Sequence, residues 1–419
     1  MLKRLMVLIF FIGGIQLHAQ TISYAQVDSV TYDLMMNKDW KQLLKEGNSA
    51  EKNKIDFYYL DYRMGMAFYY TKKYRLAQRS FEKAFSFYKY DDGLNASIYH
   101  SMLKNEYYDE ANRFSKHFSD TLAKQLKTNK FFPVNEIDLG GSTNISDTTI
   151  IYDKYFFDAG VNAKIFKGIS LYQHYNYMQL PTRDWTYRQH QYYAQINIPL
   201  VKYFSVQPAF AFFKGKMDSF TVRSPNGLIS NPELNISGWL ISLNIKKSFS
   251  FVDVSEATTI SNLSSVKRFQ LNPRVEFFPL FNNYFSFGAN YYLLKDTAAV
   301  PSKGYDVFLS VSPIKYCRLS LIYYSSMLST YVDDSSQTIY LGLKNGSMHN
   351  GLLINNNNGA LLKNFLTVSL DIMPVRKIKL SVFYGIQNKS FHPKLPDGLP
   401  ELNVNFTYTL FGSSLIFNF

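Results

Sequence analysis

The chain ends in TYTLFGSSLIFNF, residues 407–419, and this stretch decides the fold. Counting back from Phe419 in steps of two gives an apolar file that includes Phe417, Leu415 and Phe411. Small or polar residues lie mostly between its members. Successive side chains of a strand point to opposite faces, so one face of this strand would be apolar. The pattern predicts a closing transmembrane strand. We expect Phe411, Leu415, Phe417 and Phe419 to form the insertion signal that the barrel-assembly machinery reads.

One irregularity interrupts this terminal pattern. Upstream, the apolar file runs on even numbers through Val404, Phe406 and Tyr408, whereas from Phe411 it runs on odd numbers. A β-bulge inserts one extra residue and would shift the alternation in this way. The sequence therefore predicts a bulge near residues 410–412.

The first twenty residues read as a secretory signal peptide. Lys3 and Arg4 precede an apolar run from Leu5 to Ile15, and the small residue Ala19 stands before polar sequence. That order is typical of a cleaved leader. The run is too short to span a hydrocarbon core of about 30 Å. We expect export to the outer membrane of a Gram-negative cell.

Composition supports a barrel with a wet interior. Aromatic residues make up 17% of the chain, yet the mean hydropathy is only −0.17. A barrel with an apolar exterior, aromatic girdles and a polar lumen combines a high aromatic content with a low mean hydropathy. The net charge is +13 and no segment concentrates it into a basic arm. We therefore predict no nucleic-acid partner, and contacts with outer-membrane lipid and lipopolysaccharide phosphates.

A 34-residue period organises residues 21–130. Several columns of similar residues keep this interval, among them Trp40, Tyr74 and Tyr108, and Leu43, Ala77 and Ala111. The pattern resembles the tetratricopeptide repeat (TPR), in which pairs of antiparallel helices stack. Helix pairs are expected near residues 28–50, 56–87 and 93–118. In the middle pair, Gly65 matches the close helix contact and Phe81 the large core residue.

The resemblance implies a periplasmic docking domain for a protein partner. Such arrays bind peptides or neighbouring proteins in a concave groove. Tyr58, Tyr62, Tyr69 and Tyr74 are the candidate protein-binding residues, because the middle pair of helices carries an unusual number of tyrosines. The alternative is a short spacer that only packs against the barrel.

Residues 131–419 change to a period of two and predict the barrel. Between Phe157 and Ile165, for example, apolar residues alternate with polar ones or glycine. Short turns are expected near residues 167–168, 201–202, 281–283, 315–316 and 374–376, with longer polar loops between them. This asymmetry is typical of outer-membrane barrels and puts the short turns in the periplasm. We expect about 14 strands, within a range of 12 to 16, and a lumen.

The sequence shows little chemistry. The candidate lumen-lining residues are charged members of the polar files: Asp158, Lys164, Arg274, Glu276, Asp371 and Lys379. Outer-membrane barrel enzymes place a histidine with Ser, Asp or Glu near the outer rim, and His174, His190 and His349 are the candidates for such a site. No motif completes a catalytic set, so we expect no enzymatic activity, no cofactor and no metal.

The order of leader, short repeat array and carboxy-terminal barrel is similar to the repeat-plus-barrel outer-membrane proteins that export polysaccharides. The array here is much shorter than in those exporters. The resemblance implies a pore or export channel for a solute or polymer. A non-conducting scaffold that anchors a periplasmic or cell-surface complex is the alternative, and a lipid-modifying enzyme is a weaker one.

Overall fold

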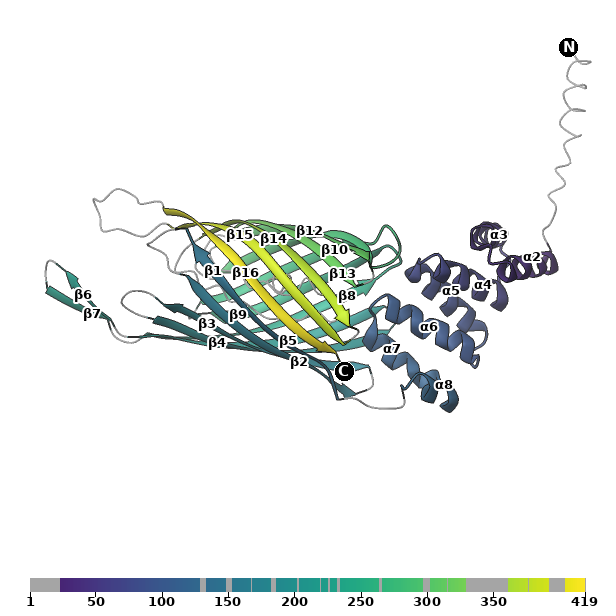
Figure 1. The fold of residues 1–419 in the computed structure, drawn as a ribbon, viewed down its shortest axis with the longest axis horizontal. Helices are drawn as coiled ribbons and strands as arrows, with labels where there is room; N and C mark the ends of the chain where they lie inside the picture. Colours follow the sequence, from purple (N-terminus) through teal and green to yellow (C-terminus); the bar gives the residue numbers. More distant parts are fainter. Residues whose placement is uncertain are drawn as a thin grey trace, which may run out of the picture.

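The computed structural model describes residues 23–418, apart from several gaps. The gaps are residues 129–132, 148–152, 167, 182–185, 202, 219, 225–226, 232–233, 264–265, 297–301, 315, 329–360, 376 and 392–403. The predicted signal peptide, His349 and Phe419 lie outside the described residues. A helical domain comes first and an antiparallel barrel follows it, as the sequence predicts (Figure 1).

The helical domain repeats with the predicted period of 34 residues. The first helices of its three pairs start at residues 24, 58 and 92, and their partners start at residues 40, 74 and 108. The turns inside the pairs also match, because Lys38, Lys72 and Glu106 all have positive φ. The helices are α2 (Tyr24–Met36), α3 (Trp40–Lys52), α4 (Tyr58–Tyr70), α5 (Tyr74–Phe87), α6 (Asp92–Lys104), α7 (Tyr108–Phe114), the 3-10 turn η1 (Ser115–His117) and α8 (Asp120–Gln125).

Caps and small residues shape these helices. Ser23 caps α2 in a capping box, and the Asp39, Asp91 and Ser119 side chains cap α3, α6 and α8. Gly65 lets α4 approach α5 closely, since a Cβ there would lie 2.4 Å from Cδ1 of Phe81. Fully buried Leu43 and Leu60 belong to one apolar core, and Phe81 and Ile98 belong to a second.

Fourteen of the described strands close into a barrel, which matches the predicted number. They are β1 (Val134–Ser146), β2 (Lys154–Phe166), β3 (Ile169–Pro181), β4 (Thr186–Val201), β5 (Phe204–Met217), β8 (Leu234–Ser248), β9 (Val252–Leu263), β10 (Val266–Phe277), β11 (Phe285–Asp296), β12 (Ser302–Ile314), β13 (Cys317–Leu328), β14 (Leu361–Val375), β15 (Ile378–Phe391) and β16 (Val404–Asn418). Neighbours in sequence pair with each other, and β1 pairs with β16 to close the wall.

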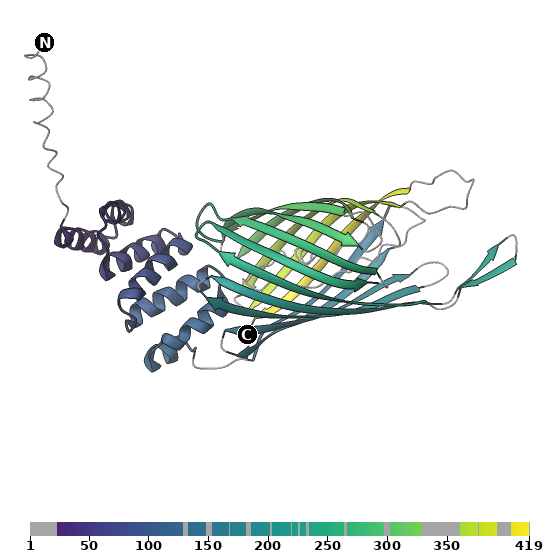
Figure 2. The same ribbon diagram turned by 180° about the vertical axis from the view of Figure 1, so that it is seen from behind.

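The two ends of the barrel differ. The predicted short turns all join strands at the end that faces the helical domain, which we call the covered end, and the carboxy terminus lies there too (Figures 1 and 2). At the opposite end, the connection from β5 to β8 carries a separate hairpin of β6 (Phe220–Ser224) and β7 (Gly227–Asn231). Both views show this hairpin projecting away from the helices.

The closing strand corrects one prediction. The pairing of β16 with β1 and with β15 runs through residues 410–412 without a register shift, so the predicted bulge is wrong. Tyr408 and Leu410 simply face the lumen, where both are buried. Phe411 and Leu415 are exposed on the outer face, and Phe417 is half-buried. The apparent switch of apolar residues from even to odd positions therefore comes from apolar side chains that face the lumen.

The wall separates an apolar exterior from a largely polar interior. Outward side chains include the exposed Phe157, Ile241, Ile260 and Leu321. Inward side chains include the buried Gln195, Thr259, Gln270 and Ser369. Alternation of this kind matches a wall that meets lipid outside and polar groups inside.

Among the helices that the structure describes, none is long and apolar enough to cross a membrane.

Candidate functional site at the junction of the helices and the barrel

The helical domain is attached to the barrel through the ends of its helices. The first backbone N–H groups of a helix have no partner within that helix. Arg75 lies in the first turn of α5, and its N–H donates to the carbonyl oxygen of Phe281 at 3.0 Å. In the same β10–β11 turn, the Asn282 amide donates to the Lys72 carbonyl and the Asn283 amide to the Asn105 carbonyl. One barrel turn thus binds equivalent loops of two successive helix pairs, α4–α5 and α6–α7.

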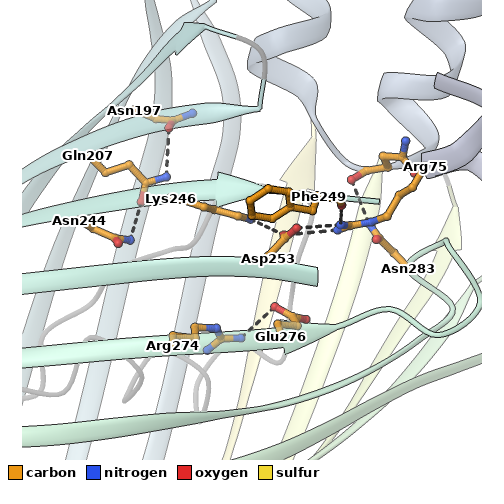
Figure 3. Close-up of polar contacts among 11 residues, drawn as sticks. Arg75, Asn197, Gln207, Asn244, Lys246, Phe249, Asp253, Arg274, Glu276 and Asn283 are labelled. Carbon is orange, nitrogen blue, oxygen red and sulfur yellow. Dashed lines mark hydrogen bonds and ion pairs between the residues drawn. The ribbon is translucent and has the colours of Figure 1, made fainter. Parts of the chain in front are cut away.

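The Arg75 side chain extends from this helix end into the barrel wall. Its guanidinium forms a two-point contact with Asp253 of β9, at 2.7 and 3.3 Å, and donates to the Phe249 carbonyl (Figure 3). It also lies 3.4 Å from the centre of the Phe278 ring. Lys246 of β8 reaches the same carboxylate at 3.0 Å. Both side chains of the Arg75–Asp253 pair are at most 6% exposed, so this ion pair is held away from water.

A second ion pair comes from the equivalent loop of the next helix pair. Glu106, one 34-residue period after Lys72, lies 2.6 Å from Arg318 of β13. The Arg318 guanidinium also donates to the Ser312 hydroxyl at 3.2 Å. The first turn of α5 and the α6–α7 loop therefore each place one charge against the inner wall, on different strands. Two attachment points of this kind restrict rotation of the domain on the barrel.

Helix α7 adds polar contacts with β3 and β4 at the covered end of the barrel. The Asp109 carboxylate accepts hydrogen bonds from the Ser170 hydroxyl and the Asn197 amide. Arg113 donates to the carbonyl oxygens of Pro199 and Leu200. Gly168 has a φ of +84°, and a Cβ there would lie 2.6 Å from Cβ of Arg113. Glycine is thus required where the β2–β3 turn meets α7.

A cavity of about 590 Å³ lies between the helices and the lumen wall. Residues of the helical domain that line it include Tyr107, Tyr108 and Glu110. Burial raises the pKa of the Glu110 carboxyl to about 7, and the neighbouring Asp109 contributes in the same direction. A titratable residue of α7 and charged side chains of the barrel wall therefore line the same cavity.

The predicted lumen residues fall into three groups. Lys164, Arg274 and Glu276 line the large cavity, and the last two form an ion pair at 3.2 Å (Figure 3). Asp371 and Lys379 border a smaller cavity of about 80 Å³ beside Arg318. Asp158 lies apart from them, on β2 beside His174.

The predicted tyrosines lie at interior contacts of the helical domain. Tyr74 is buried and packs against Tyr284 of the barrel with ring centres 6.4 Å apart. Tyr58, Tyr62 and Tyr69 are half-buried against the second core, and the Tyr58 hydroxyl donates to Asp91. Their role in protein binding stays a prediction. More exposed rings on α4 belong to Tyr59 and Tyr70.

The two described candidate histidines lie on opposite faces of the wall. His174 is buried on the lumen side, whereas His190 is exposed and contacts the Tyr175 hydroxyl. They cannot belong to one site.

Sequence reasoning missed Arg75, Glu106 and Asp253 as functional candidates. Arg75 and Glu106 occupy loop and first-turn positions that usually face water, so nothing local marks them. The 34-residue period is the one available signal, because it predicts that the two loops point in the same direction.

Together these features define an outer-membrane β-barrel protein with one end covered by its own helical domain. No protein-family model matches the sequence, and no curated protein matches it. Solved structures with a similar fold include the toluene transporter TodX of Pseudomonas putida, with 7% identity over 68% of this chain and 90% of that chain and a TM-score of 0.44. A FadL homologue of Pseudomonas aeruginosa has 9% identity over 68% and 90%, with a TM-score of 0.41. The KdgM porin has 8% identity over 68% and 99%, with a TM-score of 0.31. These likenesses are too distant to carry an argument about cargo.

Proposed function

We propose that the chain is an outer-membrane channel whose periplasmic end is covered and gated by its own helical domain. The observation that carries the proposal is the pair of ion pairs, Arg75–Asp253 and Glu106–Arg318, above a cavity that the helices and the lumen share. The contacts between the two parts are mostly polar. Polar interfaces between domains permit relative motion more readily than large apolar ones.

Planar-bilayer recording of the purified full-length protein tests this function. The intact protein should show low conductance, and the double variant Arg75→Gln/Glu106→Gln should show larger steady conductance because the domain loses both ion pairs. A control that also removes one charge of each sign is Lys45→Gln/Asp33→Asn, at exposed positions on α3 and α2. It should behave like the intact protein. Equal, negligible conductance of all three proteins would refute the channel.

We also propose that the helical domain is a tetratricopeptide-like module that recruits a periplasmic protein. Exposed tyrosines on α2 and α4 support this, because Tyr32 and Tyr59 both lie over the buried Arg63, each ring centre 5.4 Å from its guanidinium. Tyrosine on an exposed surface is common at protein contacts. In-cell cross-linking should capture a partner that is lost in Tyr59→Ala and kept in Lys45→Gln. Capture that is unchanged in Tyr59→Ala would contradict docking at this surface.

A non-conducting scaffold is the second candidate. Large inward side chains on one side of the barrel favour it, since Tyr193, Phe213 and Leu240 are at most 2% exposed and pack together. Under this alternative, removing the helical domain would leave conductance unchanged. We propose no catalytic activity for either candidate.

A further inference from the structure

Three potential metal ligands converge on the lumen face of the first three strands. They are Asp138 on β1, Asp158 on β2 and His174 on β3, and one ligand atom from each lies within 4.8 Å of the other two. All three residues are at most 7% exposed. Asp138 and His174 flank Gly160 of β2 directly, and Asp158 lies two residues before Gly160 on the same strand. The ladder register therefore sets the cluster, without help from any loop.

Glycines make room for the two carboxylates. A Cβ at Gly160 would lie 2.5 Å from both Asp138 carboxylate oxygens, and a Cβ at Gly140 would lie 2.7 Å from Oδ2 of Asp158. Each carboxylate thus lies against a glycine of the neighbouring strand, and a larger residue at Gly140 or Gly160 would displace it. Such a cradle holds the oxygens in one small volume beside the imidazole.

The spacing of Asp158 and His174 fits a shared ion better than a direct contact. His174 Nε2 lies 3.6 Å from Asp158 Oδ2, which exceeds a hydrogen bond. Ligands bound at about 2.1 Å in tetrahedral geometry are about 3.4 Å apart. The other oxygen, Asp158 Oδ1, is buried and accepts no hydrogen bond from any residue that the structure describes. A bound cation would satisfy it.

The neighbouring Tyr172 supplies the support that metal ligands usually have. Its hydroxyl donates to Asp138 Oδ2 at 3.1 Å, and its ring stacks on the His174 imidazole with centres 5.9 Å apart. Partners of this kind fix the orientation of the ligands.

We propose that Asp138, Asp158 and His174 form a binding site for a divalent transition-metal ion of the zinc class. One imidazole with two carboxylates suits Zn²⁺, whereas Ca²⁺ and Mg²⁺ prefer oxygen ligands alone. The ion would cross-link β1, β2 and β3 from the lumen side, next to the β1–β16 closure. The site does not depend on the channel function proposed above, because it uses no residue of the junction with the helices.

Metal analysis of the full-length protein tests the site. Purified protein is stripped with a chelator, incubated with ZnCl₂ and desalted, and the retained zinc is measured. The wild-type chain should retain one ion, while Asp158→Asn and His174→Gln should lose it. His190→Gln, on the outer face of the same wall, should retain it. Zinc retention by His174→Gln equal to the wild type, or none in the wild type, would overturn the proposal.

Two further measurements do not require that the ligand variants fold. Tyr172→Phe keeps the ligands and should weaken Zn²⁺ binding about 10- to 100-fold. In the wild-type chain, Zn²⁺ should raise the thermal midpoint of unfolding and Ca²⁺ should not. An equal response to both ions would show that the imidazole does not take part, and would refute the site.

Discussion

Arg75 has its backbone in the helical domain and its guanidinium inside the rim of the barrel. Removing one partner of a buried ion pair costs about 3–5 kcal/mol where the other charge is left without compensation. The cost of losing Arg75 should be smaller, because Lys246 still compensates the Asp253 carboxylate. We expect Arg75→Gln to loosen the attachment of the helical domain at this point, with faster amide exchange in residues 74–77 and 281–283, while the Glu106–Arg318 ion pair remains. Asp253→Asn should cost at least as much, because Lys246 reaches the same carboxylate. Exchange rates that match those of Lys45→Gln would contradict this role.

The raised pKa of Glu110 predicts that the stability of the helical domain depends on pH. Burial raises the pKa of this carboxyl in the folded protein from 4.5 to about 7, so folding favours the protonated form. The stabilisation is fully present below the ordinary glutamate pKa and is lost as the pH rises through about 7. The thermal midpoint of the helical domain should therefore fall between about pH 5 and pH 8.

The Glu110→Gln variant isolates this contribution. It should reduce the slope of the pH profile of the thermal midpoint, because an amide does not titrate in that range. The Asp61 carboxyl of α4, whose pKa burial also raises to about 7, should keep part of the slope. Asp33→Asn, on the exposed side of α2, should keep the slope of the intact protein. Identical slopes in Glu110→Gln and the intact protein would show that another group titrates.

Gly65 sets the distance between α4 and α5. Ala is the better helix former by about 1 kcal/mol, but a Cβ here would meet Phe81 at 2.4 Å. Overpacking in a core costs about 1–3 kcal/mol. We expect Gly65→Ala to lower the stability of the helical domain by about 1–2 kcal/mol in denaturant unfolding. Asn48→Ala, at an exposed position of α3, should be neutral or stabilising.

The elements could be predicted from the sequence because each carries its own periodic signal. The 34-residue register gave the helix pairs, and the alternation from Phe157 to Ile165 gave β2. The false bulge has the same origin, since Tyr408 and Leu410 are apolar on a face that is otherwise polar. Arg75 and Asp253 are separated by 178 residues, and no local pattern relates them. The candidate site at the junction therefore needed the structure.

The whole molecule consists of two parts that fold around separate interiors. The helical domain has two apolar cores of its own, around Leu60 and around Phe81, while its contacts with the barrel are mostly hydrogen bonds and ion pairs. A domain with its own core should fold alone. We predict that residues 23–128, expressed alone, give a helical circular dichroism spectrum and a cooperative thermal transition.

The matched comparison for this prediction is Phe81→Ala in the same fragment. Truncating a buried Phe costs about 3–5 kcal/mol, so this variant should lose the transition, whereas Arg75→Gln should keep it. Arg75 is needed only where the barrel supplies Asp253. A fragment that stays unfolded in all three forms would mean that the barrel mouth completes the helical fold. Gating by release of a folded domain would then be impossible, and uncovering the lumen would require unfolding the helices.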